Sequence, residues 1–405
     1  MQTTVVTARK IQYNRMGKII SMCNKYEENG VAKDEIISYL HIGKILHEVN
    51  LLEEQKIVLA QVLALVDLHM PDGILIAGDI YDKAVPSAEA VKVFDTFLSE
   101  LADRGLSVFL ISGNHDSSER IHFASRILQK ENIFIKGIFD GKLEPVELNK
   151  DGQKVSVYLL PYIKPFDVRP YYPEEEIDSY DRAVRTVLSH VDINPEAVNV
   201  LVAHQFITGA VSSESETVMV GGLDNIGADA FDLFDYVALG HLHRAQKVKR
   251  ETIRYCGTLF PYSFDKNEGE KSVTMLTIEQ GKEIVVDTLA IHPRHGLCTV
   301  SGSLQEVLGG EGCEEYVKVV LTDGEDQVDV VPRLRVKYPN LLTVEFEGRT
   351  RAALEGIKNA EQIADRSPME LFAEFFEERS GEKLAEEDRT LVEQMMRELL
   401  EGGES

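Results

Sequence analysis

Four hydrophobic runs in this chain end in polar residues drawn from the same few types. Each run is short enough to be a buried strand rather than a helix. The runs and the residues that follow them are 73–77 before Asp79 and Asp82, 107–112 before Asn114, His115 and Asp116, 200–203 before His204, and 236–239 before His241 and His243. Because open α/β sheets place their sites at the carboxyl ends of strands, the pattern predicts a site built from these side chains.

Helical patterns alternate with these strands. Apolar residues recur at helical spacing over 53–69 and 87–104, and a third helix is expected over 118–130. This alternation predicts a βαβ progression, which gives a layered sheet covered by helices. The stretches 155–161 and 272–291 alternate more strictly and lie closer together, which predicts antiparallel strands on the far side of the sandwich.

A second, smaller unit is expected over residues 292–350. Strands are predicted at 316–322 and 342–346 and a helix at 328–338, so this unit is a small α+β module. Within a C-terminal region at 351–405, two acidic helices that share an apolar face are expected over 368–400, with a break near Ser380 and Gly381. Two interpretations of that face stand: it packs on its own domain, or it docks on the helices of another protein.

The composition is typical of a cytoplasmic enzyme. The chain has 405 residues, enough for one large domain and smaller ones. No apolar stretch approaches the roughly 20 residues that span a bilayer, and the N-terminus lacks the hydrophobic segment of a signal peptide, so no membrane association is expected. The four cysteines form no CxxC pair, which favours a reducing compartment.

The net charge of −25 argues against tight DNA binding by this chain alone. Nucleic-acid-binding proteins usually carry a basic surface, because releasing counterions from phosphates supplies much of their affinity. The acidic residues are unevenly spread, however, with a run at 174–176 and many from 370 onward. A nucleic-acid substrate is therefore compatible with the sequence if a partner supplies the basic surface.

Asp, Asn and His side chains at strand ends are typical ligands of a two-metal phosphoesterase. Two divalent metal ions roughly 3.5–4 Å apart can clamp a phosphate and activate a bridging water. Two metal ions at such a short distance need a bridging carboxylate, and Asp79 is the natural candidate. In the expected assignment Asp79 bridges the metals, His41 and His243 bind the first, Asn114, His204 and His241 bind the second, and His115 binds neither but stabilises the phosphate or protonates the leaving group.

Each of these residues also has a structural interpretation when it is taken alone. A strand-end Asp such as Asp79 is usually a turn residue or a helix cap, and a lone His204 is more often a semi-buried structural histidine. Asp82 and Asp116 stay open, because each either orients metal ligands or caps a helix. The metal site is favoured by the set as a whole, since every member stands at a strand exit.

The same motifs carry a resemblance to a known superfamily. Gly-Asp-Ile-Tyr-Asp at 78–82, Gly-Asn-His-Asp at 113–116, His204 and Gly-His-Leu-His at 240–243 resemble the calcineurin-like metallophosphoesterases. Longer phrases resemble the SbcD family of nuclease subunits, and these lie at 41–46, 51–55, 81–87, 257–264 and 368–372.

The resemblance implies a four-layer α/β/β/α metallophosphoesterase sandwich over 36–291, a capping domain over 292–350 and a C-terminal helical region over 351–405. It implies a manganese-dependent exonuclease acting on double-stranded DNA ends and an endonuclease acting on single strands and hairpins, in DNA repair, replication and recombination. The implied partner is an SbcC-type ATPase, which would receive the C-terminal region and contribute DNA-binding surface. The nuclease subunit would be a homodimer within a heterotetramer.

One motif departs from the family. Its first motif is Asp-x-His, whereas the triplet here is Tyr39-Leu40-His41, and a phenol is a poor neutral ligand for manganese. The loss of one anionic ligand predicts a weak first metal and low activity. Residues 1–35 also lack the resemblance and form an extension of doubtful origin. Two explanations stand: a genuine variant with a damaged metal site, or a shifted reading frame upstream of His41.

Three functional hypotheses follow. The first is an SbcD-type nuclease, favoured by the longer phrases and the C-terminal region. The second is a metallophosphoesterase acting on nucleotides or phosphoproteins, which the acidic charge fits better. The third is a catalytically impaired SbcC-binding subunit, favoured only by Tyr39.

Overall fold

The computed structural model describes residues 32–37, 40–150, 152–213, 216, 224–265, 268–279, 281–323, 329–347, 389 and 392, with the backbone alone described for 32–37. The chain forms two compact units, Met1–Cys298 and Thr299–Ser405. Outside the described residues lie Tyr39, residues 1–31 of the 1–35 extension, and nearly all of the C-terminal region 351–405.

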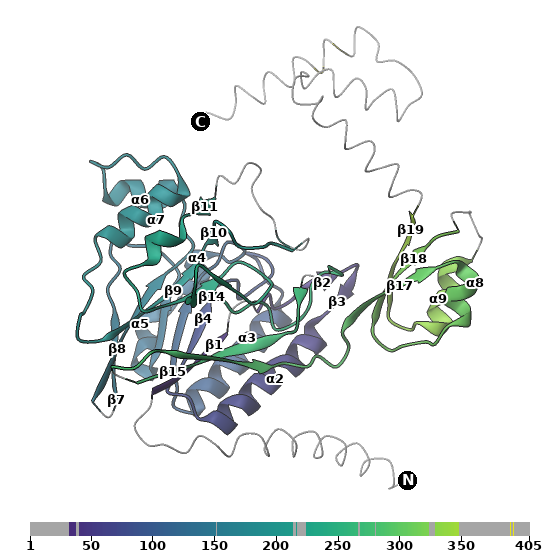
Figure 1. The fold of residues 1–405 in the computed structure, drawn as a ribbon, viewed down its shortest axis with the longest axis horizontal. Coiled ribbons are helices and arrows are strands. Elements are labelled where there is room, and N and C mark those ends of the chain that lie inside the picture. The colour runs from purple at the N-terminus through teal and green to yellow at the C-terminus, as the bar shows by residue number, and fades with distance from the viewer. Residues whose placement is uncertain are drawn as a thin grey trace. The chain divides into compact units, whose positions relative to one another are not determined.

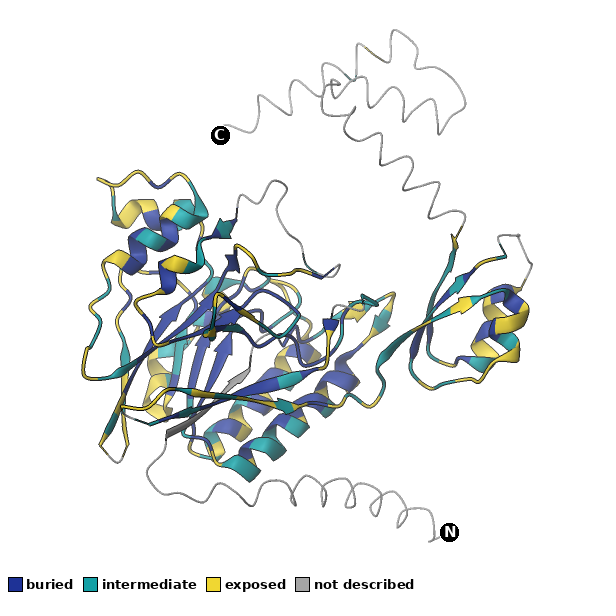
Figure 2. Ribbon diagram, viewed as in Figure 1, coloured by how far each residue is buried: buried dark blue, intermediate teal, exposed yellow. Residues whose placement is uncertain are grey.

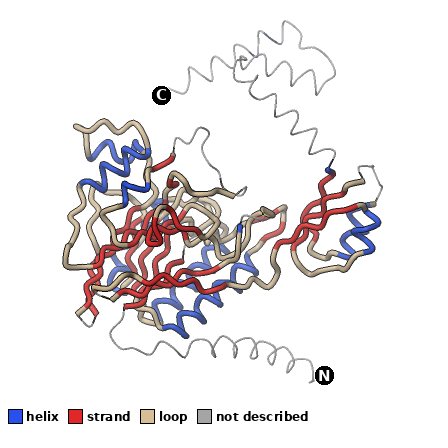
Figure 3. The backbone as a smooth tube through the Cα atoms, in the orientation of Figure 1, coloured by secondary structure: helices blue, strands red, loops and turns tan. Residues whose placement is uncertain are grey.

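The first unit contains two six-stranded sheets (Figures 1 and 3). The first sheet has the order β16-β15-β1-β4-β5-β6. Strands β1, β4, β5 and β6 are parallel, whereas β15 runs antiparallel to both of its neighbours. The bounds are β1 (Ala32–Ile37), β4 (Gly73–Ala77), β5 (Ser107–Ile111), β6 (Ile133–Lys136), β15 (Ser272–Ile278) and β16 (Val285–Ala290).

The second sheet has the order β13-β14-β12-β9-β8-β7. Its four central strands are parallel, and the edge strands β13 and β7 run antiparallel to their neighbours. The bounds are β7 (Val146–Lys150), β8 (Gln153–Leu160), β9 (Val198–His204), β12 (Tyr236–Gly240), β13 (Gln246–Val248) and β14 (Arg250–Tyr255). Two short pairs lie beside the sheets, β2 (Ile45–Leu46) with β3 (Val49–Asn50) and β10 (Phe206–Ile207) with β11 (Asn225–Ile226).

Helices cover the outer face of each sheet. The first sheet is covered by α2 (Leu52–His69) and α3 (Ala88–Asp103), and the second by α6 (Pro165–Val168) and α7 (Tyr180–Ser189). The shorter helices are α4 (Ser118–His122), α5 (Ser125–Leu128), η1 (Gln129–Glu131), η2 (Arg169–Tyr171) and η3 (Ala228–Phe231).

Alternation along the strands produces the four layers. Ile74 and Ile76 of β4 belong to the core shared with α2 and α3, whereas Leu75 belongs to the core between the sheets. In β9, Val200 faces the first sheet and Leu201 faces α7. Successive side chains of a strand point to opposite faces, so each sheet contributes to two cores. Figure 2 shows the strands buried between the helical layers, and the expected α/β/β/α sandwich is confirmed.

The two long helices end where the sequence predicts. At the end of α2 the cap residue Met70 adopts a left-handed conformation, and Pro71 follows it. At the start of α3, the Ser87 side chain accepts a hydrogen bond from the Ala90 N–H at 3.2 Å, as an N-cap does. After α3 the chain turns at Gly105, whose φ of +72° favours glycine.

Three expectations are wrong in detail. The third helix, expected over 118–130, is broken into α4, α5 and η1, because Phe123 is extended and Ala124 is left-handed. Strands β15 and β16 form the expected antiparallel pair, but they lie in the same sheet as β4 and β5. Strand β8 is antiparallel to β7 but parallel to β9, because the connection through α7 is a crossover between parallel strands.

The second unit is a small α+β module. Its sheet has the order β17-β18-β19, with β17 (Leu297–Gly302), β18 (Tyr316–Leu321) and β19 (Leu341–Phe346). Its helices are α8 (Leu304–Gly309) and α9 (Val330–Lys337), and Pro332 falls in the first turn of α9, where proline is tolerated. Among the helices that the structure describes, none is both long enough and apolar enough to cross a membrane.

Candidate metal centre

The residues predicted from the four motifs come together where the two sheets meet. Asp79 follows β4, Asn114 and His115 follow β5, His204 ends β9, and His241 and His243 follow β12. Because these strands are parallel within each sheet, their carboxyl ends share one edge. His41 reaches the same place by a backbone link, since its N–H donates to the Asp79 carbonyl at 3.0 Å.

The two sheets approach closely beside the centre because small residues stand there. His204 Nδ1 lies 2.7 Å from the Ala77 carbonyl, across the gap between the sheets. A Cβ added at Gly240 would lie 1.9 Å from that same carbonyl oxygen and 2.6 Å from His204 Nδ1. Residue 240 must therefore be glycine, because any side chain would collide with the Ala77 carbonyl. The same carbonyl accepts a hydrogen bond from His204 Nδ1–H, which leaves Nε2 of His204 facing the centre.

Asn114 joins the three residues assigned to the second metal. Its Oδ1 lies 2.9 Å from His204 Nε2 and 3.1 Å from His241 Nδ1. The Asp79 carboxylate lies alongside, with Oδ2 at 3.4 Å from His204 Nε2. These four side chains come from both sheets and present their ligand-type atoms to one point.

His41, His115 and His243 surround the other side of Asp79. His41 Nε2 lies 3.8 Å from Asp79 Oδ2, and the His41 ring centroid lies 4.9 Å from that of His115 and 5.2 Å from that of His243. The ligand atoms of His41, Asp79 and His115 all lie within 4.8 Å of one another. His115 is thus close enough to join a metal centre, although the sequence assigns it no metal.

Asp82 and Asp116 hold the loops that carry these residues. The Asp116 carboxylate accepts hydrogen bonds from the N–H groups of Ile80, Tyr81 and Gly113 at 2.9–3.1 Å, so it ties the loop after β4 to the loop after β5. Asp82 orients His115 through its backbone, because His115 Nδ1 lies 2.9 Å from the Asp82 carbonyl. That contact makes Nδ1 the donor and leaves Nε2 of His115 for chemistry.

Burial sets the protonation of most of the histidines. It lowers the pKa of His41 to about 3, although the Asp79 carboxylate opposes the shift, and it lowers the pKa of His241 to about 4. It also holds the pKa of His243 well below its usual range. In the metal-free protein these three rings are therefore neutral near pH 7, which is the form that binds metal.

Asp79 and His204 form an ion pair in the metal-free protein. Burial acts to raise the pKa of Asp79, but His204 and His41 outweigh it, so the pKa of the carboxyl lies well below its usual range. Burial acts to lower the pKa of His204, but the Asp79 carboxylate outweighs it and raises that pKa. Each partner therefore stabilises the charged form of the other.

The centre has the unpaired polar atoms and strained backbone of a binding site. His241 Nε2 is buried and has no hydrogen bond within the described part of the chain, and the buried Asp79 Oδ2 has only ion-pair contacts there, with His204 at 3.4 Å and His41 at 3.8 Å. His41, Asp79 and His241 all adopt positive φ values, at 42°, 48° and 101°. Such conformations are costly for non-glycine residues and cluster at functional sites. A set of carboxylate, amide and imidazole donors fits divalent metal ions, although the role of each residue stays a prediction.

Sequence patterns missed several residues that support the centre. Gln55 and Tyr262 are buried and hydrogen-bonded to the His41 loop. Beside His243 lies a buried ion pair, in which Lys271 contacts Glu268 and also donates to the His243 carbonyl at 3.2 Å. Only the family resemblance pointed to any of them, since Gln55 and Tyr262 fall in two of the phrases quoted for it.

Comparison with known proteins gives the class of protein. The model of the calcineurin-like phosphoesterase family matches residues 41–245, which contain all seven residues of the expected catalytic assignment. The chain therefore belongs to the calcineurin-like phosphoesterase family. Residues 293–380 match a second family model, the Type 5 capsule protein repressor C-terminal domain of SbcD proteins.

A curated relative narrows the assignment. The chain is 30% identical over 312 residues to the D subunit of the nuclease SbcCD from Staphylococcus epidermidis (strain ATCC 12228 / FDA PCI 1200), covering 75% of this chain and 82% of the relative. Within the phosphoesterases, this chain therefore groups with the D subunits of SbcCD nucleases.

Two solved structures also align with this chain. A dimetal phosphatase from Danio rerio is 10% identical, with a TM-score of 0.40 and coverage of 65% of this chain and 97% of that one. A protein from Thermus thermophilus is 12% identical, with a TM-score of 0.37 and coverage of 65% of this chain and 100% of that one.

Proposed function

We propose that this chain is the nuclease subunit of an SbcCD-type complex, a manganese-dependent exonuclease on double-stranded DNA ends and an endonuclease on single strands and hairpins. It would serve DNA repair, replication and recombination in the cytoplasm. One observation carries the proposal: His204 Nε2 lies 2.9 Å from Asn114 Oδ1 and 3.4 Å from Asp79 Oδ2, in a chain related to the D subunits of SbcCD nucleases.

The proposed residue roles are those expected from the strand-end motifs, and the contacts at the centre support them. Asp79 would hold both metal ions, His41 and His243 would hold the first, and Asn114, His204 and His241 would hold the second. When bound, two divalent ions supply an activated water and neutralise charge on the phosphodiester. His115 keeps Nδ1–H on the Asp82 carbonyl, so its Nε2 can hold a proton for the leaving oxygen.

The partners follow from the same relationship. The acidic chain requires basic surface from elsewhere to hold DNA, and an SbcC-type ATPase would supply it. In this proposal residues 292–350 form a capping domain and residues 351–405 dock on the ATPase.

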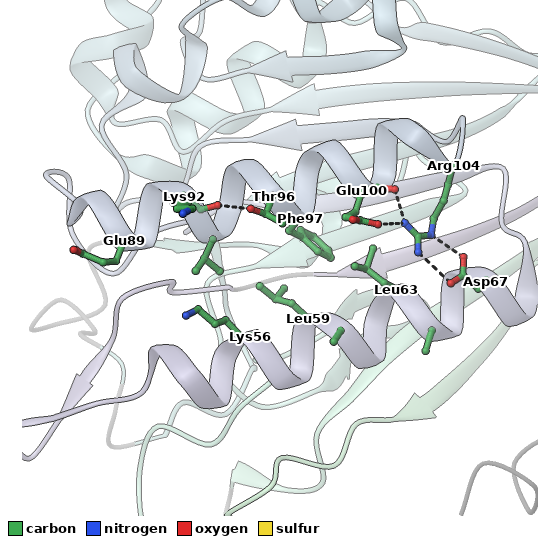
Figure 4. Close-up of a pocket in the computed structure, with 13 residues that line it drawn as sticks. Lys56, Leu59, Leu63, Asp67, Glu89, Lys92, Thr96, Phe97, Glu100 and Arg104 are labelled. Atoms are coloured by element: carbon green, nitrogen blue, oxygen red, sulfur yellow. Dashed lines mark hydrogen bonds and ion pairs between the residues drawn. The ribbon is translucent and has the colours of Figure 1, made fainter. Parts of the chain in front are cut away.

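A second copy of this chain would occupy the groove between α2 and α3 (Figure 4). The groove measures about 700 Å³, and Leu59, Leu63 and Phe97 point into it from the two helices. Its rim carries both signs of charge, with Lys56 and Glu89 among the lining residues. A twofold interface places the same patch on both partners, so an apolar groove with a mixed rim suits a homodimer within a heterotetramer.

Two alternative functions are each supported by one observation. The net charge of −25 favours a phosphoesterase acting on nucleotides or phosphoproteins. Tyr39, in the place of the family's first Asp, favours a catalytically impaired subunit that binds SbcC without cutting DNA.

The test is Mn²⁺-dependent degradation of linear duplex DNA by the complex of this chain with its cognate ATPase, beside the Tyr39→Asp variant. We expect the variant to cut DNA and the chain as it stands to cut weakly. Equal cutting by both would mean that another group replaces the missing carboxylate. If neither cuts, hydrolysis of nucleotides or phosphopeptides in the same assay would favour the phosphoesterase, and inactivity on every substrate would favour the SbcC-binding subunit.

A further inference from the structure

We propose that Gln55 and Tyr262 are positioning residues for the first metal, because they hold the backbone of His41 in the conformation that turns its imidazole towards Asp79. The inference rests on the proposed function and extends it to two residues outside the expected metal-binding set.

The Gln55 side chain closes a ring of hydrogen bonds around the His41 loop. Gln55 lies in the first turn of α2 and is 2% exposed. Its Nε2 donates to the His41 carbonyl at 2.7 Å and to the Tyr262 hydroxyl at 2.8 Å, and its Oε1 accepts from the Gly43 N–H at 2.9 Å. The amide nitrogen of Gln55 thus donates to the His41 loop and to Tyr262, and the amide oxygen accepts from the same loop.

The hydroxyl of Tyr262 completes this ring of hydrogen bonds, because it links Gln55 to the backbone of the His41 loop. Tyr262 is buried, and its hydroxyl accepts from Gln55 while donating to the Leu40 carbonyl at 3.1 Å. Its aromatic ring stands edge-on to two imidazoles, with centroid distances of 5.7 Å to His41 and 5.9 Å to His243. One side chain thus contacts both histidines assigned to the first metal.

The backbone of His41 needs such support. Its φ of +42° is unfavourable for a residue with a Cβ, and conformations of this kind persist only where the surroundings enforce them. The N–H groups of His41 and Ile42 are tied to the Asp79 loop, at 3.0 and 2.9 Å. The His41 carbonyl accepts from Gln55 Nε2 at 2.7 Å and from the Lys44 N–H of its own turn at 3.0 Å, so Gln55 anchors this carbonyl to α2 while the His41 N–H is anchored to the Asp79 loop.

The effect should be confined to one metal. Within the described residues, the side-chain hydrogen bonds of Gln55 and Tyr262 go to loop 40–43 and to each other. The three residues assigned only to the second metal, Asn114, His204 and His241, are instead linked to one another. Loss of either positioning residue should therefore weaken the first metal and spare the second. A purely structural role would instead lower stability and leave both affinities alone.

The experiment is a calorimetric titration of Mn²⁺ into the full-length, metal-free protein in the Tyr39→Asp background, which restores the family's ligand. We expect the parent to bind two Mn²⁺. Gln55→Leu should keep one site at the parent's affinity and weaken the other by about 10–100-fold, the usual effect of losing a residue that orients a metal ligand. Tyr262→Phe, which removes a single oxygen, should act in the same direction.

Gln61→Leu is the matched control. Gln61 lies on the same helix and also makes two hydrogen bonds to a loop backbone, at 2.6 and 3.0 Å to His292. It should lower the melting temperature and leave both Mn²⁺ affinities unchanged. If Gln55→Leu fails to fold, Tyr262→Phe decides the question.

Two results would overturn the inference in different ways. Two Mn²⁺ sites of unchanged affinity in both Gln55→Leu and Tyr262→Phe would refute positioning alone and leave the proposed function intact. A parent that binds no Mn²⁺ would refute the proposed function, and the positioning roles with it.

Discussion

His204 Nε2 lies 3.4 Å from Asp79 Oδ2, although His204 ends a strand of the second sheet and Asp79 follows a strand of the first. The contact closes the sandwich at one edge and places a buried carboxylate between histidines on both sides. Neighbouring imidazoles keep that carboxylate charged in the metal-free protein. A charged, incompletely hydrogen-bonded Asp79 Oδ2 is the form that a bridging ligand requires.

Asp79→Asn should therefore weaken binding at both metal sites rather than one. The substitution keeps the size of the side chain and one oxygen, which can still accept from the His115 N–H at 2.9 Å, but it removes the negative charge. In the Tyr39→Asp background, we expect Mn²⁺ affinity to fall by at least about tenfold at each site in calorimetric titration. Asp140→Asn, which removes an exposed carboxylate paired with Lys136, should change neither affinity. Loss of a single site in Asp79→Asn would show that Asp79 binds one metal only.

Gly240→Ala should destabilise the sandwich strongly. A methyl group at residue 240 would meet the Ala77 carbonyl oxygen at 1.9 Å, so the two sheets would have to separate where His204 crosses between them. We expect a loss on the order of 3 kcal/mol or more, measured by chemical denaturation, because overpacking at a backbone contact cannot relax by a side-chain rotation.

Gly309→Ala is the control for that substitution. Gly309 ends α8, and an added Cβ there meets nothing within 4 Å, so stability should stay the same or rise by up to about 1 kcal/mol through helix propensity. Equal stability of Gly240→Ala and the parent would mean that the sheets lie further apart than the structure places them.

The strand-end residues could be picked out from the sequence because each motif is local. A buried run followed by Asp, Asn or His needs only a few neighbours to be recognised, and the parallel sheets then gather the ends. Gln55 and Tyr262 could not be found in the same way, since their hydrogen bond joins positions 207 residues apart. The break at Phe123 and Ala124 was missed for a related reason, since apolar spacing over 118–130 does not reveal a change of backbone conformation.

Glu54 shows the same limit and leads to a pH prediction. It looks like one of two adjacent acids at the start of a helix, yet it is 1% exposed and bonded to Arg294 at 2.7 Å and to His295 at 2.9 Å. Burial acts to raise the pKa of Glu54, but the hydrogen bonds from these two residues outweigh it and lower the pKa. The unfolded chain therefore takes up a proton at this position before the folded chain does.

Glu54→Gln should accordingly destabilise the first unit by about 1.5–3 kcal/mol at pH 7, the range for hydrogen bonds to charged groups. The contribution is present above the ordinary glutamate pKa of 4.5 and is lost as the pH falls through the lower, folded-state value. The difference between parent and variant should therefore shrink below pH 4.5 in urea denaturation. Glu53→Gln, at an exposed neighbour paired with Lys56, should change stability by less than about 0.5 kcal/mol. A parent–variant difference that grows towards acid pH would contradict this account.

Ala60→Glu should separate the proposed dimer without disturbing the protomer. Ala60 lines the groove between α2 and α3 and is already exposed, so a longer side chain costs little in the isolated chain. In a twofold interface the same substitution occurs on both partners and would bury two negative charges in an apolar groove. Sedimentation velocity should show a dimer for the parent, a monomer for Ala60→Glu and a dimer for Ser99→Glu, which adds the same charge to α3 at an exposed residue outside the groove. Because the melting temperature of the protomer should not fall with Ala60→Glu, a dimer that survives the substitution would place the second copy on another surface.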